Sequence, residues 1–291
     1  MSSRARGPLS SSTLENRAIR PLTRSPKAAK AFGPTGDAHY FLLTEKERIG
    51  LRLPRSAVRP VVTRARHLQT ASITAAKWKQ LLVAGERVWL FSPTTTVAKM
   101  TSVASYLRAG RAGACNIEGH KIQAREPWYR TRLPTRVDGF ISGMSKKLPF
   151  LVMNGMRNLS ATNTLYVIRF RPGVDSATRF AVGTTLLSSQ IRRELAARAR
   201  VYADGLLKFE PAELGELRVS LPERLSGARM AFGAATARLL TGDEAGASAI
   251  ADKWLAASDN KDDEVSLPRN RLASLYPWDP QLVASRRASS A

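Results

Sequence analysis

The sequence predicts an α+β fold, in which small, twisted and mostly antiparallel sheets pack against helices and a C-terminal helical pair follows. Of the 291 residues, 43% are hydrophobic and 24% are charged, which is typical of a chain that buries a core. Three extended runs follow one another closely between residues 138 and 170, and segments with helical periodicity lie on either side of them.

Residues 1–36 are predicted to form a disordered basic arm. The segment is rich in Ser, Pro and Arg, and it holds seven Lys or Arg side chains but only one acid, Glu15. An organellar transit peptide has a similar composition, but Pro8, Pro21 and Pro26 interrupt the amphipathic helix that it would need.

Residues 37–222 are predicted to form one α+β domain. In its first half we expect a strand at 40–43, a helix capped by Ser72 and stopped by Gly85, a strand at 88–91, and a helix from 97 that ends at Gly110.

The second half of this domain begins with the runs "DGFISGM", "PFLVMN" and "TNTLYVIRF", which predict a sheet because apolar residues alternate with period two in the last of them. A single helix is expected from Ser176 to about Tyr202, with Arg192 among the arginines that face outward. A turn at Asp204-Gly205, a short strand, a helical turn begun by Pro211 and a final strand complete the domain.

An alanine-rich segment at 223–258 predicts an antiparallel pair of helices that is broken at Gly242-Asp243. The remaining residues, 259–291, are predicted to form a loose tail.

Charge is the property in which this chain departs most from the average. The 46 Lys and Arg residues outnumber the 23 Asp and Glu residues, giving a net charge of +23, which indicates a polyanionic partner and favours nucleic acid. An anionic membrane is the rival partner, but no apolar run approaches the roughly 18 residues of a membrane-spanning helix, so we expect no membrane association.

Cys115 is the single cysteine, which excludes an internal disulfide framework, and the three histidines lack the spacing of metal ligands. A cytoplasmic protein is expected. Cys115 has no histidine partner in local sequence, so a core or loop position is favoured over a nucleophile.

The stretch "KIQAREPWYRTRLPTRVDGF" at 121–140 combines positive charge with flat aromatic rings, the two components of nucleic-acid contact. Trp128 and Tyr129 either stack on bases or anchor the loop in the core. The cations around them are Lys121, Arg125, Arg130, Arg132 and Arg136.

Small polar residues in "RNLSATNTLYV" directly precede an apolar strand. Thr162 and Asn163 in this run can reach base edges or phosphates, or can cap a local turn.

Motifs of nucleic-acid-modifying enzymes are missing from the sequence. No two prolines are adjacent, so the Asn/Asp-Pro-Pro-aromatic element of adenine methylation is absent, and no P-loop, nucleophile elbow or metal-binding histidine pair occurs. The sequence therefore favours a binding protein that reads nucleic acid over a catalyst.

The ordered set of motifs resembles the C-terminal target-recognition region of gamma-type adenine-N6 DNA methyltransferases of type II and type IIG restriction-modification systems. The resemblance covers about residues 40 to 257, and its pieces are "IGLRLPRSAVRPVV", "YLRAG", "REPWY", "LVMNGMRNLSATNTLYVIRF", "LLSSQIRRELAARARVYADGLLKFEPAELGELRVSLP" and "EAGASAIADKWL". Each piece is weakly specific alone, whereas their order is fairly specific.

This resemblance implies a domain that grips duplex DNA opposite a catalytic domain, reads a short sequence and helps to hold the strand while the target adenine is flipped out. Family motif positions are matched by Trp128, Tyr129, Thr162, Asn163, Gly205, Lys208 and Pro211, several of which are scaffold residues in that family. The candidate DNA-binding residues are therefore Lys121, Arg125, Trp128, Tyr129, Arg130, Arg132, Arg136, Thr162, Asn163 and Lys208.

In that family a domain that binds S-adenosylmethionine normally precedes this region, whereas here only the basic arm does. We therefore expect no catalytic residue, cofactor or metal in this chain, no methyl transfer by the chain alone, and S-adenosylmethionine on a methyltransferase catalytic partner in trans. A split enzyme, a truncated remnant and a mis-called start codon are all open explanations. The alternative functions are an RNA-binding or ribosome-associated accessory protein and a fragment that binds DNA without sequence preference.

Overall fold

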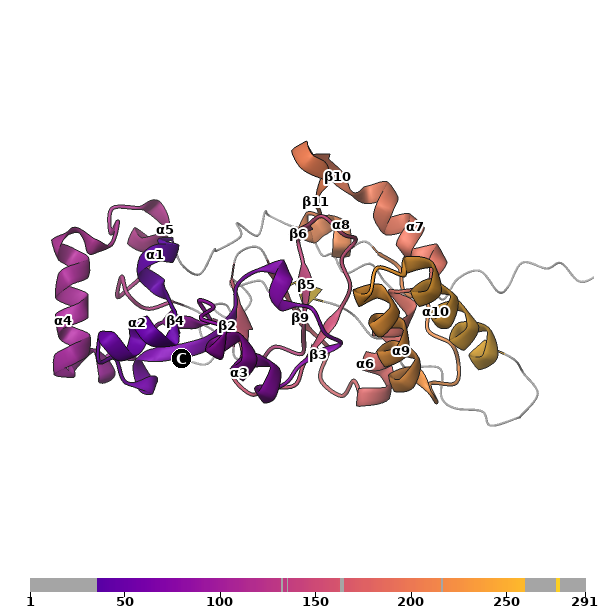
Figure 1. Cartoon of the computed structure of the whole chain (residues 1–291), viewed down its shortest axis with the longest axis horizontal. Coiled ribbons are helices and arrows are strands. Elements are labelled where there is room, and N and C mark those ends of the chain that lie inside the picture. Colours follow the sequence, from indigo (N-terminus) through magenta and orange to yellow (C-terminus); the bar gives the residue numbers. More distant parts are fainter. Residues whose placement is uncertain are drawn as a thin grey trace, which may run out of the picture.

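The computed structural model describes residues 36–259, except 132, 135, 163, 164 and 216, together with the two residues at 276–277. The predicted arm at 1–36 and the predicted tail at 259–291 lie almost wholly outside these residues. Helices and small, mainly antiparallel sheets make up the described part, which confirms the α+β class. Figure 1 shows an elongated molecule with an N-terminal lobe at one end, a central sheet and a lobe of helices at the other end.

The N-terminal lobe is built on a four-stranded sheet of order β1-β4-β2-β8, in which only the β2–β8 pair is parallel. Its strands are β1 (Leu42–Leu43), β4 (Trp89–Phe91), β2 (Val58–Val62) and β8 (Ser160–Ala161). Its helices are α1 (Ala38–Phe41), α2 (Glu45–Gly50), α3 (Ala75–Val83), α4 (Thr101–Ala109) and α5 (His120–Gln123), and a π-helical turn at Gly110–Ala114 continues α4.

A five-stranded central sheet of order β12-β9-β5-β7-β3 divides the molecule. Its strands are β12 (Tyr276–Pro277), β9 (Leu165–Arg169), β5 (Gly139–Ser142), β7 (Val152–Asn154) and β3 (Ser72–Ile73). Successive side chains of a strand point to opposite faces of the sheet, and here each face packs against a core. Phe140 belongs to the core of the N-terminal lobe, whereas its neighbour Ile141 belongs to the core of the helical lobe. One sheet thus serves two cores.

The helical lobe consists of α6 (Ser176–Thr185), α7 (Ser189–Arg198), α8 (Pro211–Gly215), α9 (Ala228–Leu240) and α10 (Glu244–Asp259). The predicted C-terminal helical pair is confirmed as α9 and α10, which are separated by a turn where Gly242 adopts a φ of 91°. Phe232 of α9 packs in the same core as Met153 of the central sheet. The predicted domain boundary between residues 222 and 223 stays a prediction.

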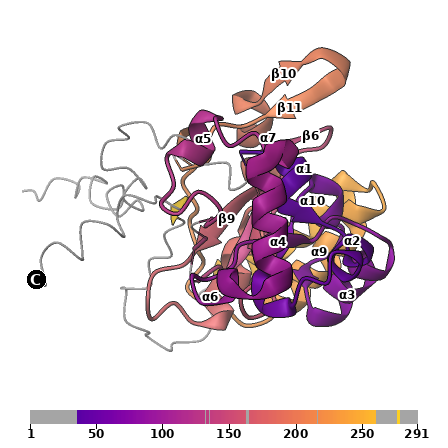
Figure 2. The same ribbon diagram turned by 90° about the vertical axis from the view of Figure 1, so that its left-hand side faces the viewer.

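The third sheet, of order β10-β11-β6, is the smallest and projects from the body of the molecule (Figure 2). Its strands are β10 (Arg200–Tyr202), β11 (Leu206–Lys208) and β6 (Met144–Ser145), all antiparallel. Among the described helices, none is both long enough and apolar enough to span a bilayer.

Two predicted strands differ from the structure. Residues 40–43 are strand only at Leu42–Leu43, because the Asp37 carboxylate accepts the backbone N–H groups of His39 and Tyr40 and so caps a helical turn. Residues 217–222 form no strand, although Leu217 and Val219 are buried in the helical lobe. Apolar residues alternate with polar ones here and produced the strand signal, but no described strand pairs with this segment.

The single helix predicted from Ser176 to about Tyr202 is wrong, since the structure has α6 and α7 with a break between them. Ser188 caps α7 by accepting the backbone N–H of Ile191 at 3.4 Å. Arg192, predicted to face outward, is 6% exposed. Its guanidinium donates to the Pro149 oxygen at 2.9 Å and pairs with Glu244 at 3.1 Å, so its charge is compensated in place.

Candidate nucleic-acid interface

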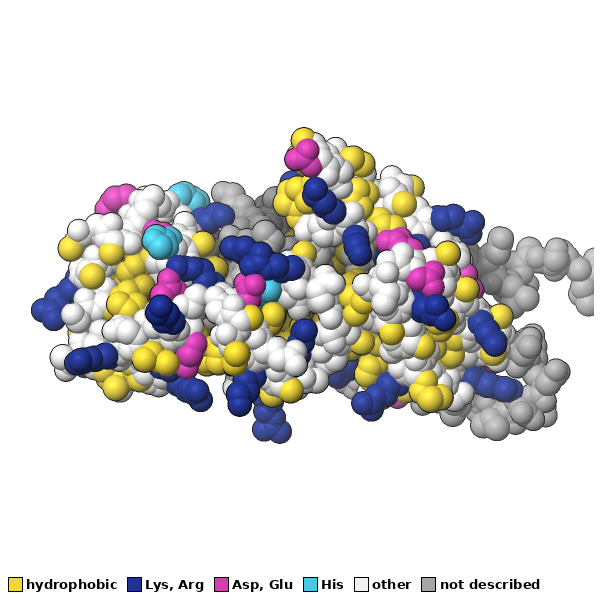
Figure 3. All heavy atoms as spheres, viewed as in Figure 1, with side chains coloured by type: hydrophobic (Ala, Val, Ile, Leu, Met, Phe, Trp, Pro, Cys, Tyr) yellow, Lys and Arg dark blue, Asp and Glu magenta, His cyan; other side chains and the backbone are white. Residues whose placement is uncertain are grey.

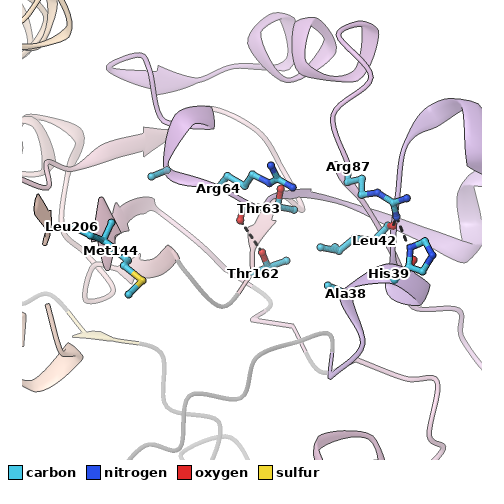
Figure 4. Close-up of a pocket in the computed structure, with 10 residues that line it drawn as sticks. Ala38, His39, Leu42, Thr63, Arg64, Arg87, Met144, Thr162 and Leu206 are labelled. Atoms are coloured by element: carbon cyan, nitrogen blue, oxygen red, sulfur yellow. Dashed lines mark hydrogen bonds between the residues drawn. The ribbon is translucent and has the colours of Figure 1, made fainter. Parts of the chain in front are cut away.

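An open cleft of about 600 Å³ separates the N-terminal lobe from the small projecting sheet. In Figure 4, Met144 and Leu206 lie on one side of the cleft, Ala38 and His39 on the other, and Arg64 between them. The full lining is Ala38, His39, Leu42, Thr63, Arg64, Ala65, Arg87, Met144, Thr162 and Leu206. In Figure 3, Lys and Arg side chains lie beside the hollow next to the projecting sheet, and others are distributed along the lower edge of this face.

The two arginines of the cleft differ in how much of their charge is already used. Arg87 pairs with Glu47 and donates to the backbone oxygens of Leu42 and His39. Arg64 is exposed and has neither an ion pair nor a hydrogen bond to any described side chain. Arg64 is therefore the cleft cation that is available to an anionic ligand.

The loop that carries Arg64 is fixed by a buried histidine. His67 is 1% exposed; its Nδ1 accepts the Thr63 N–H at 3.2 Å, and its Nε2 lies 3.1 Å from a Glu86 oxygen. This arrangement defines a neutral imidazole that donates from Nε2 to the carboxylate. The Glu86 carboxylate also forms an ion pair with the Arg66 guanidinium, with an N–O distance of 2.8 Å. The loop is thus held from within, and Arg64 is left at the lip of the cleft.

Acid is expected to destabilise the fold through this cluster. Burial lowers the pKa of His67, and the hydrogen bond from Arg66 is the main cause that lowers the pKa of Glu86. The folded protein therefore binds fewer protons than the unfolded chain, and the free energy of unfolding should fall as the pH drops below about 6.5. Urea titrations between pH 8 and pH 5 measure this change.

The control for this prediction is His67→Gln, which keeps a polar side chain but cannot titrate. Its free energy of unfolding should vary less between pH 7 and pH 5 than that of the wild type. Equal slopes in the two proteins would show that His67 does not contribute to the acid sensitivity.

The structure places the aromatic pair of the 121–140 stretch against the N-terminal core. The Trp128 ring lies 5.8 Å from the Tyr40 ring and 6.3 Å from the Phe41 ring, and Tyr129 packs edge-on at 5.9 Å. A Cβ at Gly110 would come within 2.7 Å of the Trp128 ring, so the absent side chain makes room for it. Of the two alternatives for Trp128, the packing supports the anchor.

The cations of the same stretch lie in different environments. The Arg125 guanidinium lies 5.0 Å from the centre of the Phe41 ring, and burial lowers its pKa. Lys121 and Arg130 are exposed. Arg136 is also exposed but pairs with the buried Asp138 at 3.3 Å. Arg132 lies outside the described residues.

Two further candidate residues, Thr162 and Lys208, lie at or near the cleft. Thr162 lines it, but its side chain is buried and its hydroxyl donates to the Thr63 oxygen at 3.3 Å. Lys208 lies on β11 and pairs with Glu210 at 2.7 Å. Asn163 is outside the described residues. The structure thus brings the Thr162 and Lys208 segments to one cleft, while Trp128 and Tyr129 are packed in the N-terminal lobe.

The sequence reading did not single out Arg64 or Arg87. The available signal was the run "TRARH", in which Arg64 and Arg66 follow shortly after the apolar end of β2. Only the structure distinguishes Arg64 from Arg66, because the acid that pairs with Arg66 is 20 residues further along the chain.

Cys115 is buried in the N-terminal core, and burial raises the pKa of its thiol to about 11. The thiol is therefore protonated at neutral pH and is a poor nucleophile. The predicted core or loop position is confirmed, since Cys115 lies in the core.

Comparison with known proteins gives the class of this fold. The family model of the C-terminal domain of Type II methyltransferase M.Eco57I matches residues 28–254, and the chain belongs to this family. The resemblance to the C-terminal region of type II DNA methyltransferases is thereby confirmed.

A particular relative is Type II methyltransferase M.AccI from Acinetobacter calcoaceticus, which is 21% identical over 184 residues. The matched segment is 62% of this chain and 33% of the relative, so the chain spans about a third of the length of that protein.

Proposed function

We propose that this chain is the target-recognition region of an adenine-N6 DNA methyltransferase of a restriction-modification system, and that it binds duplex DNA in the cleft beside Arg64. In this proposal a catalytic region, in another chain or elsewhere in the same protein, binds S-adenosylmethionine and transfers the methyl group. Membership of a methyltransferase C-terminal family and the excess of positive charge support the proposal.

The observation that carries the proposal is the state of Arg64. An exposed guanidinium without a counter-ion among the described residues stands at the lip of a cleft, on a loop that is already fixed. In duplex DNA, the anions that an exposed arginine contacts are the backbone phosphates. We propose that Arg64 makes such a contact. Because the loop is already fixed, binding costs little conformational entropy in ordering it.

Duplex binding is expected to weaken steeply with salt. If about five phosphates are neutralised, log K should fall with a slope of roughly −4 to −5 in log[salt]. Arg64→Gln should reduce the magnitude of this slope by about 1. The matched control is Arg238→Gln, since Arg238 is also exposed but pairs with Asp243 on the helical pair.

Fluorescence anisotropy of a labelled duplex between 50 and 300 mM salt measures these slopes, with structured RNA as competitor. A flat salt response, or RNA that displaces the duplex at equal concentration, would contradict the proposal. The second result would favour the RNA-binding alternative.

A further inference from the structure

Residues 200–208 form a two-stranded ribbon, which we call the finger. In its antiparallel register, Arg200 lies opposite Lys208 and Tyr202 lies opposite Leu206. The connecting turn has positive φ at Asp204 (61°) and Gly205 (68°), which closes the ribbon tightly. Figures 1 and 2 both show the finger standing clear of the rest of the molecule.

The finger exposes apolar side chains that the core does not use. Val201 is 71% exposed and Tyr202 is 46% exposed, and all three residues of β10 are exposed. No described strand pairs with the outer edge of β10. Exposed apolar residues on an unpaired edge invite aggregation. The exposed Tyr202 ring indicates a surface that meets a partner on its own face of the ribbon.

Strand register defines which face of the finger looks into the cleft. Residues directly opposite each other in an antiparallel pair share a face. Leu206 lines the cleft, so Tyr202 opposite it lies on the cleft face. Lys208 is on the same face, with its ammonium 5.8 Å from the centre of the Tyr202 ring. Val201 points to the other face.

The base of the finger is firmly attached to the body. Directly after β11, Phe209 is 1% exposed in the helical core, and its backbone oxygen accepts the Tyr166 hydroxyl at 2.8 Å. At the base of the finger, Arg200 forms an ion pair with Glu213 of α8 at 2.8 Å. A projecting ribbon with such an anchor can enter a groove without being ordered first.

The charges of the finger indicate what it touches. Its stem cations, Arg200 and Lys208, are already paired with Glu213 and Glu210, and its turn carries Asp204. Because this charge is nearly balanced, the finger is poorly suited to bind phosphates. Arg64, across the cleft, is better suited to that role. Apolar side chains at the end of a ribbon suit the interior of a groove, where thymine methyl groups are exposed.

We propose that the finger enters the major groove of the bound duplex, and that Tyr202 and Leu206 contact base edges there, including thymine methyl groups. The major groove is wide enough to admit a two-stranded ribbon. This inference rests on the proposed function, because it assigns the reading of bases to one element of the same cleft. Arg64 of the cleft then contributes affinity without sequence preference.

The test begins by selecting duplexes from a random-sequence pool with the full chain. The ratio of affinities for a selected duplex and a random duplex is then measured for the wild type, Tyr202→Ala and Val201→Ala. Tyr202→Ala should lower this ratio by about tenfold or more with an unchanged salt slope. Val201→Ala, on the same strand but the opposite face, should stay within about twofold of the wild-type ratio.

Replacing thymine by deoxyuridine in the selected duplex should weaken binding by the wild type more than by Tyr202→Ala. An unchanged ratio in Tyr202→Ala, with thermal unfolding as in the wild type, would overturn the role of the finger and leave duplex binding intact. A wild type that selects no duplex would overturn both the finger and the proposed function.

Discussion

Trp128→Ala is expected to lower the free energy of unfolding by about 3 kcal/mol and to leave the DNA affinity of the folded protein unchanged. The ring packs against Tyr40 and Phe41 and fills the space that Gly110 leaves open. Its removal therefore creates a cavity in the N-terminal core. Urea denaturation measures the stability, and anisotropy titration at low temperature measures the affinity.

Trp128→Phe is the matched variant, because it retains one aromatic ring in the same place and should lose about half as much stability. The opposite result in Trp128→Ala, weakened DNA binding with an unchanged unfolding midpoint, would show that the ring stacks on a base.

Asp138→Ala is expected to lower the free energy of unfolding by about 2 to 3 kcal/mol. The buried carboxylate accepts the Phe170 N–H at 2.8 Å and pairs with Arg179 at 3.0 Å and with Arg136 at 3.3 Å. Its loss leaves the Phe170 N–H buried without an acceptor and removes the counter-ion of both arginines. Thermal and urea unfolding measure the effect.

Arg136→Ala is the control for this change, and it should cost less than about 1 kcal/mol because the Arg136 side chain is 41% exposed. Equal losses in the two variants would contradict the central role of Asp138. DNA affinity should not fall in Asp138→Ala, since Arg136 is then released from its acid.

The parts of the fold that the sequence predicted are those set by local periodicity. Alternation with period two in "TNTLYVIRF" correctly placed Ile168 and Val167 on opposite faces of a sheet. The helical pair followed from a Gly turn between alanine-rich segments. These features depend on residues that are close in sequence.

The errors arose where distant residues decide. Arg192 resembles a surface arginine until Pro149 and Glu244 are brought beside it. The packing that supports the anchor for Trp128 involves Tyr40, which is 88 residues away in the sequence. The cleft itself requires β6 and β11 to pair across about 60 residues, and no local pattern encodes that register.

The central sheet also limits how this molecule can be divided. Phe140 and Ile141 are neighbours in β5 but belong to different cores, so both halves of the molecule pack on the same central sheet. Excising either half would strip an apolar surface from the same strands, and the isolated pieces should aggregate. The finger, by contrast, contributes only the partly buried Leu207 to a core, so its outer residues could be exchanged for another ribbon while the shared sheet stays intact.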